Sequence, residues 1–335
     1  RLDEALDVYN CAIYFKPGYA EAYSNRGVIL KDLNRLDESL ESYDSAIFFK
    51  ENYAEAYCNR GNVMRELNRL DEALISYNRA IEIDPCYAEA YCNRGSVLKE
   101  LNRLNEALES YNRAIYLRPD YAGAYSHRGV VLKELNRLDE ALLDYDQAIY
   151  LKPDCVGAYF NKFVLKILKG DYLEGWLLYE WRWKKAGIYS PLFLNKNKKM
   201  MPGKHRRILV WAEQGIGDEL MFSSLLSEFN SLCSKLLVKV DARIIPLLSR
   251  SLKKDIIFIS EDKDVNEDDY DEHVPIGSLC QYLRNSKESF EKTRYGWLVD
   301  DKIDQEVKLS NEQEYNKRKK LMHNSMSVLN TREKE

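Results

Sequence analysis

A unit of 34 residues recurs through the N-terminal half of the chain and constrains its fold more than any other feature. The same step separates Gly27, Gly61, Gly95 and Gly129 from one another, as it does Tyr57, Tyr91, Tyr125 and Tyr159, and Pro85, Pro119 and Pro153. Repetition at this period predicts a solenoid, because a single unit cannot bury its own apolar face and must stack on its neighbours.

The copy Ala88–Tyr121 shows how each unit is expected to fold. Apolar residues at helical spacing predict one helix over residues 88–101 and a second over 105–117, which Pro119 ends. Asn102 lies between the two helices, where the chain needs a left-handed backbone conformation, and Asn is the best residue after Gly for that conformation. The unit is therefore predicted to be a helical hairpin.

An aromatic residue, a Gly, an Ala, a second aromatic and a Pro stand at fixed offsets, which in this copy are Tyr91, Gly95, Ala107, Tyr111 and Pro119. This pattern resembles the tetratricopeptide repeat and implies an α superhelix. Full units run over residues 20–53, 54–87, 88–121 and 122–155. Residues 1–19 match the second helix of a unit whose first helix is missing, so we expect the natural N-terminus to lie upstream.

The resemblance also implies that the first helix of each unit lines a concave groove, with its second and sixth residues pointing inward. The sixth positions hold Asn25, Asn59, Asn93, His127 and Asn161. A side-chain amide carries both a donor and an acceptor, so a ladder of amides could pair with the backbone of an extended peptide. The array resembles the superhelix of O-linked N-acetylglucosamine transferases, which holds protein substrates in this way. The alternative is that these residues bond neighbouring helices.

Arginine also recurs, at Arg26, Arg60, Arg94 and Arg128, and we expect it to pair with acidic groups of adjacent units. The net charge of −4 argues against nucleic-acid binding. We find no apolar run of membrane-spanning length, and the seven cysteines include no CxxC pair, which favours reduced thiols and a cytoplasmic location.

The repeat decays after residue 155, and the array is predicted to span residues 1–183. Its last segment, GWLLYEWRW at 175–183, holds three of the five tryptophans. We expect these rings to cap the array and to dock it on the next domain, with a sugar-stacking platform as the alternative. A basic linker over residues 184–207 follows.

From residue 208 the pattern changes to alternating strands and helices. Strands are predicted over 208–212, 236–240, 256–259 and 273–275, and helices over 219–232, 243–252 and 278–284. This order predicts an α/β half-domain over 208–299 whose ligand site lies at the carboxyl ends of the strands. Residues 300–335 are too polar to form a packed domain and read as a helical or disordered tail.

Three segments, WAEQGIGDELMFSSLL, VDARIIPLLSRSL and HVPIGSLCQYLR, resemble the glycosyltransferase-like domain that follows tetratricopeptide repeats in many bacterial proteins. That domain is similar to the N-terminal, Rossmann-like half of the GT-B fold and is related to heptosyltransferases. The resemblance implies that Asp218 is the candidate base, although capping of its helix is an equal alternative. It also implies an acceptor or phosphate turn built from Glu213, Gln214, Gly215, Gly217, Arg243, Gly277 and Ser278.

A GT-B enzyme binds its nucleotide-sugar donor mainly in a second α/β domain, for which this sequence has no counterpart. We therefore predict that the chain transfers no sugar alone and binds a nucleotide-sugar only with that missing domain. The sequence indicates no cofactor and no metal cluster. The predicted function is an interaction scaffold that binds an extended protein segment or peptide in the groove. The alternative is the acceptor-binding part of a glycosyltransferase.

Overall fold

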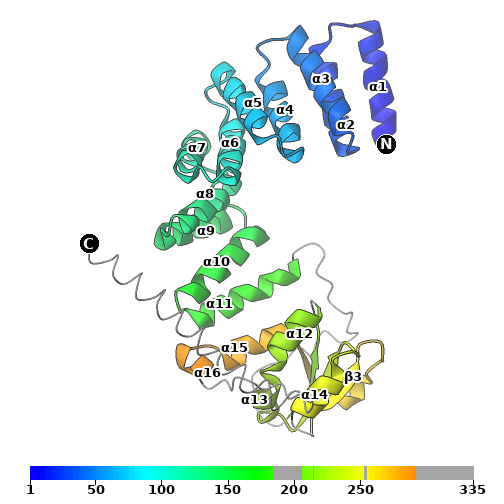
Figure 1. Cartoon of the computed structure of the whole chain (residues 1–335), viewed down its shortest axis with the longest axis vertical. Helices are drawn as coiled ribbons and strands as arrows, with labels where there is room; N and C mark the ends of the chain where they lie inside the picture. The colour runs from blue at the N-terminus through cyan, green and yellow to red at the C-terminus, as the bar shows by residue number, and fades with distance from the viewer. Residues whose placement is uncertain (185–205, 214, 253–254, 292–335) are drawn as a thin grey trace, which may run out of the picture. The chain divides into compact units, whose positions relative to one another are not determined.

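The computed structural model describes residues 1–184, 206–213, 215–252 and 255–291 (Figure 1). The chain divides into two compact units, residues 1–165 and 166–335, and each is described here by itself. The tail predicted over 300–335 and nearly all of the predicted basic linker lie outside the described residues. In the part that is described, we find no helix with the length and apolar character needed to cross a membrane.

The first unit is a succession of helical hairpins. Its helices are α1 (Leu2–Phe15), α2 (Ala20–Asp32), α3 (Leu36–Phe49), α4 (Ala54–Glu66), α5 (Leu70–Ile83), α6 (Ala88–Glu100), α7 (Leu104–Leu117), α8 (Ala122–Glu134), α9 (Leu138–Leu151) and α10 (Val156–Leu168), which runs past the boundary. Even-numbered helices are the first helices of the repeats and odd-numbered helices the second. The helices predicted over 88–101 and 105–117 correspond to α6 and α7 to within one residue at each end.

Asparagine closes each hairpin in the conformation expected of it. The turns between first and second helices place Asn34, Asn68, Asn102 and Asn136 at φ values of 58° or 59°. This is the left-handed region of backbone conformation, which residues other than Gly, Asn and Asp rarely adopt. The prediction made for Asn102 is confirmed.

Inside each hairpin a tyrosine ring of the second helix lies on a glycine of the first. A Cβ added to Gly95 would lie 2.9 Å from the Tyr111 ring, so the glycine is needed for the close approach of α6 and α7. The buried Tyr111 hydroxyl bonds the Ser96 hydroxyl at 3.0 Å. In the next repeat the buried hydroxyl of Tyr145 has no hydrogen-bond partner among the described residues.

The four repeated arginines link successive units. Arg94 of α6 donates to the Asn78 side chain on α5 at 3.2 Å and to the Ser110 hydroxyl on α7 at 3.1 Å. The same offset of sixteen residues on either side joins Arg26 to Asn10 and Ser42, Arg60 to Asp44 and Ser76, and Arg128 to Asn112 and Asp144. We call this set the arginine ladder.

Within the described residues, the expected acidic partner in a neighbouring unit is found only for Arg60, which bonds Asp44. Arg128 bonds an acid of its own unit, Asp144, and the remaining acceptors are asparagines and serines. Each arginine nevertheless joins the second helices of two consecutive units, because its two acceptors lie on different helices. The arginines thus link neighbouring units as expected, but most of the side chains that they bond are asparagine or serine and not acids.

The second unit contains a small parallel sheet. After α11 (Tyr172–Tyr179) and η1 (Glu180–Lys184), its elements are β1 (Arg207–Trp211), α12 (Ile216–Ser223), α13 (Leu226–Asn230), β2 (Lys235–Val240), α14 (Ile245–Ser251), β3 (Ile257–Ser260), η3 (Glu267–Asp269), β4 (Glu272–Pro275), η4 (Ile276–Leu279), α15 (Cys280–Leu283) and α16 (Lys287–Glu291). The strand order is β3-β2-β1-β4, and every pairing is parallel. The carboxyl ends of all four strands therefore lie at one edge.

The single helix predicted over 219–232 is two shorter ones, α12 and α13. The backbone N–H of Leu225 donates to the carbonyl oxygen of Phe222, three residues earlier, and the Ser224 hydroxyl donates to the carbonyl oxygen of Met221. These tighter bonds end α12 at Ser223 and turn the chain. Apolar periodicity continues across this break, which is why the sequence predicted one helix.

The tryptophans of the 175–183 segment pack within the second unit. Trp176 lies against the apolar core beneath the sheet, and its indole N–H donates to the carbonyl oxygen of Arg284 at 2.7 Å. Trp183 lies 5.5 Å from Trp211, measured between ring centroids. Segment 175–183 thus covers apolar surface of the α/β unit, while the expected capping of the repeat array stays a prediction.

Candidate functional site

The even-numbered helices from α2 to α8 form one continuous face, because α2 contacts α4, α4 contacts α6, and α6 contacts α8, and α10 is the first helix of the following unit. Their sixth residues recur along this surface, which we call the amide face and define by Asn25, Asn59, Asn93, His127 and Asn161. Three of them, Asn25, Asn59 and Asn161, make no side-chain hydrogen bond within the described residues, and none of the three is buried. Their donors and acceptors remain available.

Asn93 is used inside the array instead. Its side-chain amide donates to the Asn62 Oδ1 at 3.0 Å, and the Tyr77 hydroxyl donates to the same oxygen at 2.8 Å. The alternative interpretation, in which the asparagines bond neighbouring helices, therefore applies to this position. The side-chain oxygen of Asn93 accepts no bond from the described residues and stays available.

His127 occupies the fourth position of the amide face. Its Nδ1 lies 3.7 Å from the Cys92 Sγ, and its ring lies 5.9 Å from that of Tyr111. His127 is exposed, but the surrounding helices still desolvate its ring, and this desolvation, aided by the positive charges of Arg65 and Lys99, lowers the pKa of His127. At neutral pH the ring is therefore an uncharged donor and acceptor, as an amide is.

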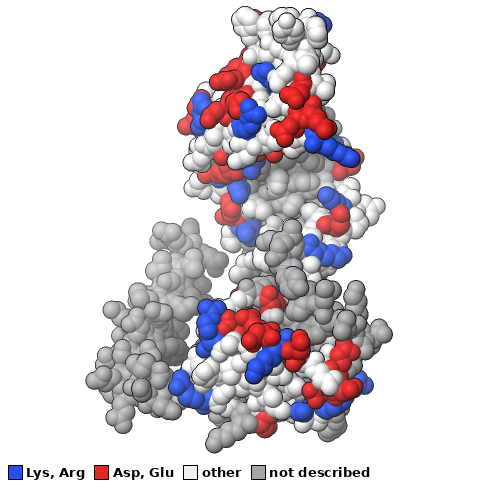
Figure 2. Space-filling model, turned by 90° about the vertical axis from the view of Figure 1, so that its right-hand side faces the viewer, with Lys and Arg blue, Asp and Glu red and all other residues white. Residues whose placement is uncertain are grey.

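Ion pairs join consecutive even-numbered helices. Lys31 pairs with Glu66 at 3.1 Å, and Arg65 pairs with Glu100 at 3.0 Å. On the side of the molecule displayed in Figure 2, basic and acidic residues lie intermixed. Each of these two pairs joins opposite charges on neighbouring helices.

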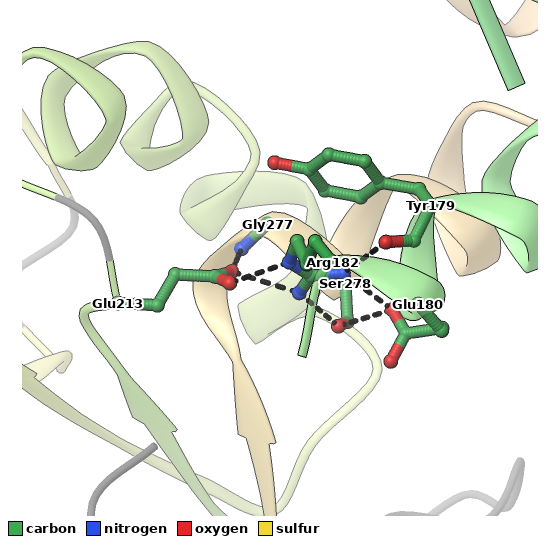
Figure 3. Close-up of polar contacts among 6 residues, drawn as sticks. All are labelled: Tyr179, Glu180, Arg182, Glu213, Gly277 and Ser278. Atoms are coloured by element: carbon green, nitrogen blue, oxygen red, sulfur yellow. Dashed lines mark hydrogen bonds and ion pairs between the residues drawn. The ribbon is translucent and has the colours of Figure 1, made fainter. Parts of the chain in front are cut away.

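The carboxyl ends of β1 and β4 hold a second group of polar residues, shown in Figure 3 and called the Arg182 cluster. Its members are Tyr179, Glu180, Arg182, Glu213, Gly277 and Ser278. Arg182 donates from Nε and Nη2 to the Glu213 carboxylate at 2.7 and 3.0 Å. It also donates to the Ser278 hydroxyl at 2.8 Å, the Glu180 carboxylate at 2.9 Å and the Tyr179 carbonyl oxygen at 3.1 Å. All five guanidinium N–H groups are used.

The other members of the Arg182 cluster are equally committed. Glu213 accepts the backbone N–H of Gly277 at 2.6 Å, and the Ser278 hydroxyl donates to Glu180 at 2.6 Å. The side chains of Arg182 and Glu213 are only 2% and 0% exposed. Burial raises the pKa of Glu213, and the paired Arg182 opposes that rise. A Cβ at Gly277 would lie 2.5 Å from the Glu213 carboxylate, so this contact requires glycine.

The residues predicted to form an acceptor or phosphate turn have different positions. Glu213, Gly277 and Ser278 meet, but their polar groups bond Arg182 and one another. Arg243 instead pairs with the neighbouring Asp241 at 2.6 Å. Arg182 was not predicted as a partner of this turn, because its only signal in the sequence is its place inside the tryptophan-rich segment.

The rest of that turn is open. At Gly215, whose φ is 142°, and at Gly217 an added Cβ would meet no atom within 4 Å. Asp218 lies in the first turn of α12 and is half-buried, and among the residues that the structure describes no side chain caps the N-terminus of this helix. The capping role considered for Asp218 is thus not seen here. Gln214 lies outside the described residues.

Comparison with known proteins identifies the first unit. A family model described as "TPR repeat" matches residues 27–67, 61–102 and 95–136, and one described as "Tetratricopeptide repeat" matches 122–155. Residues 27–155 are tetratricopeptide repeats. A helical array of such repeats fits protein–protein interaction, which is the class of function that the sequence predicted.

Protein FlbA of Caulobacter vibrioides is 26% identical over 156 residues, which cover 40% of this chain and a quarter (25%) of that protein. Solved structures with similar repeats include YrrB, a TPR protein with an unusual peptide-binding site, at 25% identity and a TM-score of 0.43, covering 52% of this chain and 89% of that one. Another is PilF of Pseudomonas aeruginosa, at 18% identity and a TM-score of 0.47, covering 56% of this chain and 78% of that one.

Proposed function

We propose that the amide face of the tetratricopeptide array binds an extended segment of a partner protein through the backbone of that segment. The observation that carries this proposal is the set of unpaired amides of Asn25, Asn59 and Asn161, together with the neutral ring of His127. Each of these groups can donate and accept at once, as a peptide unit does. An array of such groups at one repeat position selects for an extended backbone more than for particular side chains.

Peptides selected from a random display library against the whole chain provide a probe for this proposal. Each lost hydrogen bond costs about 0.5–1.5 kcal/mol, so Asn25→Ala, Asn59→Ala and Asn161→Ala combined should weaken binding by at least about tenfold in calorimetry. Asn105→Ala, an exposed asparagine at the start of α7, is the matched control and should bind as the wild type does.

A second comparison isolates the backbone. A selected peptide that is N-methylated at alternate residues keeps its side chains and loses backbone donors, so its affinity for the wild-type chain should fall. If the methylated peptide binds equally well, or if the triple variant keeps full affinity, the amide face is not the binding surface.

One observation favours a second candidate function. β2 and β3 lie on one side of β1, and β4 lies on the other side of β1. The strand order therefore reverses between β1 and β4. Ligands of open α/β sheets bind outside the carboxyl ends of the strands at such a point. The open turn at Gly215 and Gly217 precedes α12 there, and a helix N-terminus attracts anions.

On this second proposal the α/β unit is the acceptor-binding part of a glycosyltransferase, with Asp218 as the base. Calorimetry with a uridine diphosphate sugar should give no heat with this chain alone, because a donor domain is needed to hold that ligand. Tight binding that Gly217→Val abolishes would contradict this expectation and would make the α/β unit an active site in its own right.

A further inference from the structure

The second helices of the repeats carry exposed aromatic residues at one repeated position. The penultimate residues of α1, α3, α7 and α9 are Tyr14, Phe48, Tyr116 and Tyr150, which are 80%, 77%, 74% and 79% exposed. The equivalent residue of α5 is Glu82. Because these five residues share one position of the repeat, they follow one another along the array, and we call them the aromatic row.

This exposure is not explained by the packing of the array. Tyr111 and Ala114, which pack inside the hairpin, are buried. Tyr116, two residues after Ala114 on the same helix, is exposed to solvent. Single exposed apolar residues are common, but a large exposed ring that recurs at one position in four of five repeats is a pattern that favours an interaction surface.

The aromatic row reads the same in both directions. From either end it runs aromatic, aromatic, acid, aromatic, aromatic, with Glu82 in the middle. In a two-fold symmetric interface both copies use the same patch, so if residue i of one copy contacts residue j of the other, residue j of the first also contacts residue i of the second. A row of residues can therefore pair with a second copy of itself only if its order is the same from both ends. An antiparallel second copy would set Tyr14 against Tyr150 and Phe48 against Tyr116.

The centre of the row supplies matching charges. On α5, Arg79 lies three residues before Glu82 and pairs with it at 2.9 Å, and both side chains are about half exposed or more, at 46% and 63%. Across a two-fold axis at this point, Arg79 of each copy would reach Glu82 of the other. The exposed Ile75, one turn earlier on α5, adds apolar surface beside this pair.

The available area suits a second copy. A buried aromatic side chain contributes about 150–250 Å², so the eight rings of two copies supply roughly 1,200 Å², the lower limit of a stable interface. The cations that follow the rings are held by their own chain, since Lys16 lies over Tyr19 and Arg118 over Tyr121. We propose that two copies of this chain associate antiparallel through the aromatic row, about a two-fold axis beside Glu82.

The test uses the whole chain, 39.3 kDa, in multi-angle light scattering and sedimentation velocity over a concentration series. The wild type should reach twice the chain mass. Arg79→Glu alone and Glu82→Arg alone should each be monomers, because like charges would then face each other across the axis. An equimolar mixture of these two variants should dimerise again, since one copy would carry two acids and the other two arginines.

Two further variants complete the test. Phe48→Ser combined with Tyr116→Ser should raise the dimer Kd by roughly a hundredfold, because aromatic residues dominate such interfaces. Arg103→Glu, which breaks another Arg–Glu pair of the same spacing outside the row, should dimerise as the wild type does. A wild type that stays monomeric at all concentrations, a dimer indifferent to Arg79→Glu, or a variant mixture that stays monomeric would overturn the proposal.

Discussion

Replacing Arg182 by methionine tests whether the Arg182 cluster holds the second unit together. The change removes five hydrogen bonds and leaves the carboxylate of Glu213, whose side chain is 0% exposed, without its counter-charge. Removing one partner of a buried ion pair costs about 3–5 kcal/mol, because the remaining charge stays desolvated and unpaired. We expect the free energy of unfolding of the second unit to fall by that amount.

The assay follows from the distribution of tryptophan. All five tryptophans lie after residue 165, so their fluorescence during denaturant unfolding reports on the second unit and not on the repeats. Arg250→Met is the matched control, because that arginine lies exposed on α14 of the same unit, and its transition should stay close to that of the wild type.

A double variant separates the pair from its parts. The variant with both Arg182→Met and Glu213→Leu has neither buried charge. Its loss of unfolding free energy should therefore be smaller than the sum of the losses of the two single variants. If Arg182→Met costs less than about 1 kcal/mol, or if the two losses simply add, the buried pair does not act as the structure indicates.

Four other substitutions give independent checks. Trp176→Ala should lower the stability of the second unit by about 3 kcal/mol in the same fluorescence assay, since it empties a site against the core. Tyr145→Phe should leave the melting temperature of the repeats unchanged or raise it, because it removes a buried hydroxyl without a partner, whereas Tyr111→Phe should lower it. Pairing with Arg243 lowers the pKa of Asp241 to about 2, so its stabilisation is complete above the usual value near 3.8 and is lost as the pH falls through 2. Asp241→Asn should therefore flatten the fall in melting temperature between about pH 5 and pH 2, and an unchanged acid profile would contradict that pKa.

The sequence predicted the repeat array closely because its determinants are local. Asn102 and Gly95 act within a single hairpin, and their neighbours in space are near them in sequence. The strands were also found to within a residue or two, since each is a short apolar run. The break between α12 and α13 escaped prediction because it depends on backbone bonds that apolar periodicity does not reveal.

The Arg182 cluster could not be found in the same way. Arg182 lies 31 residues from Glu213 and 96 from Ser278, and nothing in the intervening sequence links them. Glu213, Gly277 and Ser278 do meet, but the side chain that joins them belongs to Arg182, in a segment that the sequence placed in the repeat array. The asparagines of the amide face look alike in sequence, and only the structure distinguishes Asn93, which bonds inside the array, from Asn59, which makes no side-chain bond within the described residues.

The arginine ladder bears on how such a gene can change length. Each arginine of the ladder finds its acceptors sixteen residues before and after itself, on the two second helices that flank it. An in-frame recombination that adds or removes one unit of 34 codons keeps this spacing. The arginine at the new junction therefore still has an acceptor on each of the two second helices that flank it. Asn, Asp and Ser all serve as acceptors, so the joined copies need not be identical. Unequal crossing-over can then be inherited without a compensating mutation, and the number of repeats becomes free to drift among descendants of the same gene.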